Sequence, residues 1–250
     1  MKKNKMMRIA SVLLIAALLS TSVISGTFAK YVTAASAGDT ARVAKWGVTV
    51  TAAGSLFDTT YNDTPPANTD AGGSSLTYTV RSSTTDAVVA PGTDNMEQAN
   101  ETAKTLKVNV AGVPEVAVHV NFAVTNVKDV KLPKGPVLDW TTGNETTDTF
   151  DLADDYYPVQ FTLTQNGATV VENKKLSDVA AWLAGKSADY AAGTDLGTVI
   201  GELELTWHWT FDANDKADTA LGQIAAGAYS LSGSETNASI DIAVSVTQVD

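Results

Sequence analysis

Strict alternation of apolar and polar residues is the feature that most limits what this chain can fold into. A period of two places one set of side chains on one face of a β-strand and the other set on the opposite face. The clearest stretch has Leu203, Leu205, Trp207, Trp209 and Phe211 alternating with polar residues. The same period recurs over residues 116–124 and 240–246, and over shorter runs at 46–52, 76–80, 106–110 and 159–163.

Turn residues separate these runs. Asn166-Gly167 predicts a type I′ hairpin turn, and Pro91-Gly92 has the residues that a type II turn prefers. Residues 58–75 are rich in Thr, Asn, Pro and Gly and are predicted to form a surface loop.

One helix is predicted, with Leu176 as a hydrophobic staple, Ser177 as N-cap and Gly185 at its end. It is short, so we expect a lid or crossover. The predicted fold class is all-β: an antiparallel jelly-roll-like sandwich of about eight strands with one short inserted helix.

The first 29 residues have the organisation of an export signal. Four basic residues precede an apolar run over residues 9–24, and Thr27 and Ala29 supply the small side chains before a cleavage site. The run is shorter than the roughly 20 apolar residues of a spanning helix. We therefore expect a signal peptidase to cut between Ala29 and Lys30, so that only the uncleaved precursor contacts the membrane. The alternative is that the segment stays uncleaved as a membrane anchor. Residues 30–250 are then predicted to be one secreted β-sandwich domain with a flexible segment at 30–40.

The charge balance excludes some classes of partner. Four of the 17 Lys and Arg residues and none of the 28 Asp and Glu residues lie in the export segment, so the remaining 221 residues carry a formal charge of −15. Such an acidic surface disfavours nucleic acid as a partner. The chain has no cysteine, so its fold must rest on a hydrophobic core without disulfides.

The residues do not form a recognisable catalytic motif. The only histidines, His119 and His208, are far apart and both fall on the polar faces of predicted strands, where we expect them to face solvent. There is no Cys nucleophile and no Gly-x-Ser-x-Gly motif. We therefore expect no enzymatic activity.

Two further groups of residues have alternative interpretations. Oxygen-bearing side chains cluster after the Trp-containing strand: Asp212, Asn214, Asp215 and Asp218. They either bind Ca²⁺ or form a solvated acidic turn. The absence of an EF-hand pattern favours the solvated turn. Trp207 and Trp209 either stack on sugar rings or pack in the core. They alternate in step with Leu203 and Leu205 and so lie on the same face of the strand, which favours packing in the core. No other cofactor is expected.

Several motifs resemble those of the TasA/camelysin family of exported proteins. They are the Gly26–Ala29 junction followed by Tyr31, the Ala41–Trp46 segment before the first strand, the Val88–Thr93 turn, the Trp207-x-Trp209-x-Phe211 strand, the Asp218–Gly222 stretch and the ending Val246–Asp250. Proteins of this family are surface and biofilm-matrix proteins of Gram-positive bacteria, processed by a signal peptidase of the SipW type.

The resemblance implies a structural subunit of an extracellular surface or matrix fibre. Its partners would be other copies of itself and other matrix or surface proteins. We expect a terminal segment to pair with an exposed sheet edge of the next subunit, and the candidate donor residues are Lys30, Tyr31, Val32 and Thr33. The alternative is a monomeric surface adhesin or a module that binds glycan or protein.

Overall fold

Two main antiparallel sheets contain all but one of the alternating runs; the run at 76–80 overlaps β3 (Tyr78–Arg81), in a separate hairpin. The computed structural model describes residues 42–57, 60–63, 78–81, 87–95, 105–139, 148–210 and 213–249. The chain divides into two units, Met1–Ala44 and Lys45–Asp250. Residues 42–44 are the only described part of the first unit, so the fold is that of the second.

The larger sheet has five strands in the order β1-β4-β11-β8-β9. Their bounds are Val48–Ala53 (β1), Leu106–Gly112 (β4), Gly201–Trp209 (β11), Val159–Gln165 (β8) and Ala168–Lys174 (β9). The second sheet has three strands in the order β10-β5-β12, with bounds Ala188–Tyr190 (β10), Val118–Lys128 (β5) and Ser239–Gln248 (β12).

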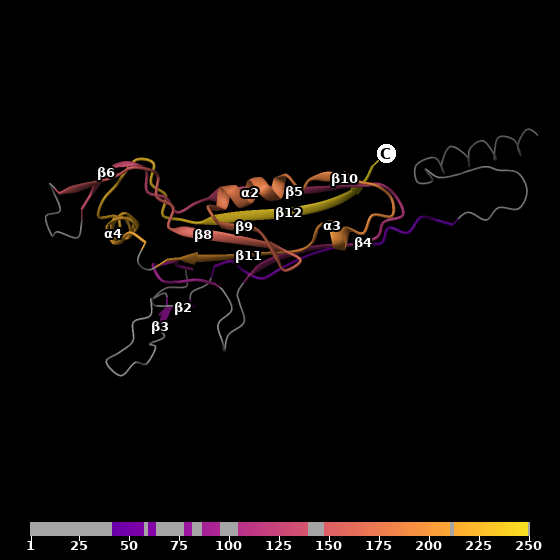
Figure 1. Ribbon diagram of the computed structural model, residues 1–250, viewed down its shortest axis with the longest axis horizontal. Helices are drawn as coiled ribbons and strands as arrows, with labels where there is room; N and C mark the ends of the chain where they lie inside the picture. The colour runs from indigo at the N-terminus through magenta and orange to yellow at the C-terminus, as the bar shows by residue number, and fades with distance from the viewer. Residues whose placement is uncertain are drawn as a thin grey trace, which may run out of the picture. The chain divides into compact units, whose positions relative to one another are not determined.

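Every strand pair in these sheets is antiparallel, and the chain crosses repeatedly from one sheet to the other. The crossings fall between β4 and β5, β5 and β8, β9 and β10, β10 and β11, and β11 and β12. Figure 1 shows the two layers, with β5, β10 and β12 in one and β4, β8 and β11 in the other. Alternation between layers is typical of Greek-key sandwiches. The predicted antiparallel β sandwich is confirmed.

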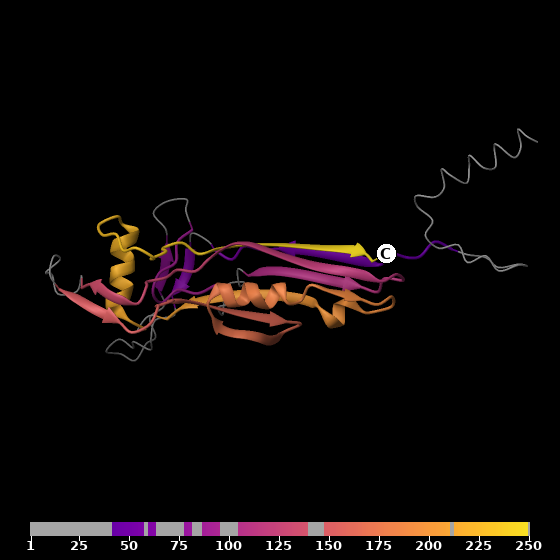
Figure 2. The same ribbon diagram turned by 90° about the horizontal axis from the view of Figure 1, so that it is seen from above.

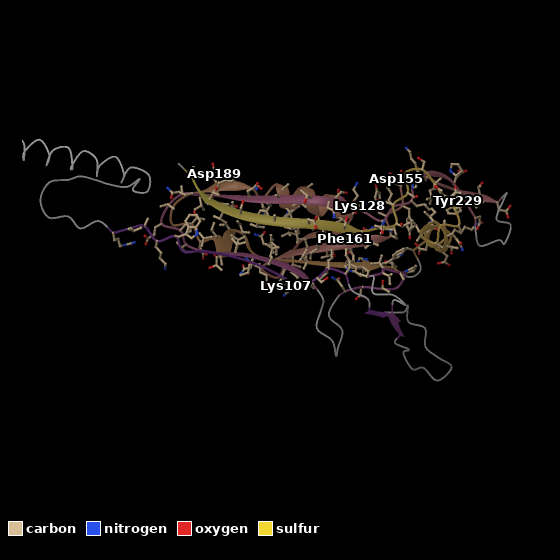
Figure 3. The ribbon with its side chains drawn as sticks, turned by 180° about the vertical axis from the view of Figure 1, so that it is seen from behind. Lys107, Lys128, Asp155, Phe161, Asp189 and Tyr229 are labelled. Atoms are coloured by element: carbon tan, nitrogen blue, oxygen red, sulfur yellow. The ribbon has the colours of Figure 1, made fainter. Side chains whose placement is uncertain are left out.

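One continuous core fills the space between the sheets. Val120 and Phe122 of β5 and Phe161 of β8 are at most 3% exposed, and the inward residues of β4 and β11 join them. Phe161 lies between the layers in Figure 3. The apolar residues at alternate positions of the predicted strands are therefore the ones that fill the core.

The described chain also holds two small hairpins outside these sheets. β2 (Thr60–Asp63) pairs with β3 (Tyr78–Arg81), and β6 (Gly135–Leu138) pairs with β7 (Thr149–Leu152). The predicted loop over residues 58–75 thus includes a strand at 60–63, and its other residues lie outside the described part.

Three helices occur in the described chain, where one was predicted: α2 (Leu176–Ala184), α3 (Leu196–Val199) and α4 (Asp215–Ala225). The residue before α2 is Lys175, so the expected Ser177 N-cap is wrong. The carboxylate of Asp129 accepts hydrogen bonds from the N–H groups of Leu176 and Ser177 instead. A cap from Asp129, the residue that follows β5, replaces the local one.

Both turn predictions hold. Asn166 and Gly167 have φ angles of 51° and 78°, as a type I′ turn requires, and they join β8 to β9. Gly92 has a φ of 82°, and the N–H of Thr93 donates to the carbonyl of Ala90 at 3.1 Å.

Candidate assembly edge

Among the described strands, β12 forms one edge of the three-stranded sheet and pairs with β5 alone. In register, Val246 lies beside Val120 and Val244 lies beside Phe122. Val120 is fully buried and Phe122 is 3% exposed, whereas Val244 and Val246 are only half-buried. Because directly paired residues share a face, the inward face of β12 is incompletely covered.

The facing edge of the five-stranded sheet has the same property. Val50 of β1 is paired with Val110 of β4, yet Val50 is 38% exposed while Val110 is fully buried. β1 contacts β12, and the two strands run along the same side of the sandwich (Figure 2). The partly exposed apolar side chains of both strands therefore lie along the same side of the sandwich.

The opposite side of the sandwich is closed by α2. Leu176, Val179 and Leu183 of this helix are at most 1% exposed, and the helix packs on β5, β8 and β9. A lid or crossover was expected; the helix covers this side of the sandwich and also lies in the connection from β9 to β10, which belong to different sheets. Among the described residues, no helix closes the side bordered by β1 and β12.

β12 also has fewer features that prevent pairing at its outer edge than β9, the edge strand of the larger sheet. Edge strands commonly avoid unwanted pairing through charges, bulges or short length. β9 has two register irregularities and a positive φ of 48° at Asn173, between the charged residues Glu172 and Lys174. β12 has ten residues with Asp241 as its one charged residue, and its one register irregularity lies near its start, between Ser239 and Asp241. No described strand pairs with its outer edge. This edge, with the half-buried residues behind it, is the candidate assembly edge.

The predicted donor residues Lys30, Tyr31, Val32 and Thr33 lie outside the described residues, as do Thr27 and Ala29 of the predicted cleavage site. The predicted pairing of this segment therefore stays a prediction. No helix within the described residues is long and apolar enough to cross a membrane.

Trp207 and Trp209 are core residues. They are 1% and 6% exposed, the indole N–H of Trp207 donates to the carbonyl of Leu56 at 2.7 Å, and its ring packs near Phe57. The sugar-stacking alternative is wrong, because no face of either ring is free at the surface.

The two histidines lie apart from each other. His119 is at the surface, with its Nδ1 atom 2.6 Å from a carboxylate oxygen of Asp189 on β10. His208 lies on the polar face of β11 as expected, but it is half-buried. Residues 92–95 pair with the end of β11 through main-chain hydrogen bonds to Trp207 and Trp209, and Asp94 is the residue paired with His208. Burial lowers the pKa of His208, and the charge of Asp94 opposes that effect.

The predicted calcium ligands that the structure describes lie at the start of α4 and in its first turn, in different environments. Asn214 caps the helix by accepting a hydrogen bond from the N–H of Ala217 at 3.1 Å, and Asp215 is exposed. Asp218 is buried, and Asp212 lies outside the described residues. Within the described chain no group of three or more His, Asp or Glu side chains is arranged to hold a metal ion.

Asp218 joins three parts of the fold. One of its oxygens accepts hydrogen bonds from the Tyr156 hydroxyl at 2.7 Å and from the Trp209 indole at 3.2 Å. The other oxygen is buried without a hydrogen-bond partner. Burial raises the pKa of Asp218 to about 6, against the lowering effect of the two donors, and the charge of Asp215 raises it further. Burial also raises the pKa of Tyr156, which keeps its hydroxyl protonated as a donor.

Comparisons with protein-family models, with curated proteins and with solved structures found no match for this chain.

Proposed function

We propose that this protein is a secreted structural subunit of an extracellular surface or matrix fibre, and that subunits join by strand complementation. The observation that carries the proposal is the uncovered side of the sandwich at β12. A neighbouring chain that adds a strand there would pair with the free main-chain groups of β12.

The added strand would also cover apolar side chains. Val244 and Val246 of β12 and Val50 of β1 are partly exposed beside fully or nearly fully buried neighbours. Removal of apolar surface from water stabilises association by roughly 25 cal/mol per Å². Main-chain pairing and apolar burial therefore favour the same position for a partner strand.

The candidate donor is residues 30–37, which would begin the mature chain after cleavage at Ala29. Tyr31-Val32-Thr33 is rich in residues that favour β-strands. The resemblance to the TasA/camelysin family supports both the export signal and the fibre role. The proposal assigns the protein no catalytic role.

The test compares the mature protein with a truncated form that lacks residues 30–37. The described strands begin at Val48, so the truncated form keeps the sandwich. We expect the mature protein to form filaments that sediment and are visible by negative-stain microscopy, and the truncated protein to stay monomeric. Filaments from the truncated protein would contradict strand donation by this segment, and dispersed particles from both would favour a monomeric surface-binding module.

A further inference from the structure

The chain leaves the sandwich next to an exposed tryptophan. Trp46 is 43% exposed and immediately precedes Gly47 and β1. Val113, just beyond the paired strand β4, is 48% exposed. In the β1·β4 register Val48 pairs with Gly112, and a Cβ atom on Gly47 would lie 2.7 Å from the carbonyl oxygen of Val113. Trp46 and Val113 therefore lie at the same end of the sheet.

This end is held in a defined conformation. The N–H of Lys45 donates to a carboxylate oxygen of Glu115 at 2.7 Å, and the N–H of Glu115 donates to the carbonyl of Lys45 at 3.1 Å. Gly47 has a φ of 61°, which L side chains rarely adopt, so its contact with Val113 requires glycine. The two hydrogen bonds and this turn fix the point at which the N-terminal segment departs.

The distance that this segment can span limits where a neighbouring subunit can lie. Eight residue steps separate Ala37, the end of the candidate donor, from Lys45. At about 3.3–3.6 Å per residue, a fully extended chain covers less than about 30 Å, which is roughly the diameter of a small domain. The sandwich that accepts the donor must therefore bind it within about 30 Å of the end of the molecule that carries Trp46.

We propose that Trp46 and Val113 form a second contact between subunits, in which they pack against the copy of this chain that accepts the donor segment. The inference rests on the proposed function, because the donor segment brings the two copies together. Tryptophan is enriched among the residues that dominate protein interfaces, since a large rigid ring buries much area at low entropic cost. This contact adds apolar burial to the interface between subunits, beside the main-chain pairing of the donor strand.

The first test is Trp46→Ser in the mature protein. We expect its midpoint of chemical unfolding to stay at the wild-type value, because Trp46 is exposed in the single subunit. The protein concentration needed for filament formation should rise by about tenfold or more. Glu172→Ser, an exposed change on β9 away from this end, is the matched control and should leave that concentration unchanged.

A second measurement reports the contact directly. Because the chain has no cysteine, Val113→Cys introduces a single thiol that an alkylating reagent can label. We expect labelling to be fast in the monomer and strongly slowed in filaments, whereas a Glu172→Cys thiol is labelled equally in both.

The two proposals fail in different ways. If the protein without residues 30–37 forms filaments, strand donation is wrong, and the contact inferred from it falls too. If that truncation abolishes assembly, but Trp46→Ser assembles at the wild-type concentration and the thiol at position 113 stays reactive in filaments, then strand donation stands and the Trp46 contact is overturned.

Discussion

Trp209 lies at the end of β11, 6% exposed, and donates its indole N–H to Asp218. Trp209→Ala removes a large core side chain and one of the two donors to a buried carboxyl group. We expect it to lower the free energy of unfolding by roughly 3–5 kcal/mol, measured by chemical denaturation.

The neighbouring His208 is the control for this substitution. It is half-buried on the other face of β11, so His208→Ala should cost about 1 kcal/mol or less. Equal losses for the two variants would contradict the assignment of faces along this strand.

Asp218 should make stability depend on pH. Its pKa is raised to about 6 in the folded protein from an ordinary value of 3.8, mainly by burial. A raised carboxyl pKa means that the folded state binds the proton more tightly. The stabilisation is complete below about pH 4 and is lost as the pH rises through about 6.

We therefore expect this group to lower the free energy of unfolding by up to about 3 kcal/mol between pH 4 and pH 7. Asp218→Asn cannot ionise and should flatten that part of the profile, as measured by denaturant titrations at several pH values. Asp215→Asn, which alters an exposed carboxyl on the same helix, should retain most of the slope. A slope that survives in the Asp218 variant would assign it to other groups.

Single residues could be placed from the sequence wherever parity decides burial. The period of two correctly assigns Trp207 and Trp209 to the core. It places His208 on the opposite face but does not predict that this residue is half-buried, because residues 92–95, more than 100 positions away, pair beside it. It also places Val244 and Val246 inward without indicating that they stay half-buried, since that depends on which strand lies next to β12.

At the scale of elements, the cap of α2 is the clearest long-range feature. The carboxylate of Asp129 accepts from the N–H groups of Leu176 and Ser177, which have no carbonyl partner within the helix. Asp129→Ala should lower the free energy of unfolding by about 1–2 kcal/mol.

Asp178 is the matched control for the cap, because it is an exposed acid in the first turn of the same helix. Asp178→Ala should change stability by less than about 1 kcal/mol, through the helix dipole alone. If thermal or chemical unfolding finds both variants equally stable, the Asp129 cap contributes nothing.

The sequence predicts the elements that carry strong periodicity and misses the weakly apolar ones. β5, β8, β11 and α2 follow directly from their patterns. α4 is missed because its buried positions include two alanines and Asp218, which weaken the apolar pattern. Asn214 as N-cap and the spacing of Ala217, Ala220, Leu221 and Ile224 are nevertheless a helical signal. β10 and α3 are only three and four residues long, and neighbouring contacts rather than local pattern determine them.

For the whole molecule, charge should control assembly. A formal charge of −15 on each mature subunit opposes contact between copies, and salt screens that repulsion. We expect the concentration needed for filaments to fall as ionic strength rises from about 0.01 M to about 0.15 M. Sedimentation measures this, and NaCl and CaCl₂ of equal ionic strength should act alike. A requirement for micromolar Ca²⁺ would indicate a bound calcium ion instead of screening.

The candidate edge as a whole could not be predicted from sequence. Alternation predicts a sandwich but not the strand order, and the strand order is what leaves β12 at an uncovered side. The sequence does supply the candidate donor, because the cleavage signal defines where the mature chain would begin.

Hydrogen exchange on the truncated protein that lacks residues 30–37, with and without a synthetic peptide of that sequence, tests strand addition at β12 directly. We expect the peptide to slow exchange of the amides of β12, residues 239–248, and to leave exchange of the amides of β9 at the opposite edge unchanged. Protection at β9 instead of β12, or no protection at saturating peptide, would contradict the claim that β12 accepts a strand from the next subunit.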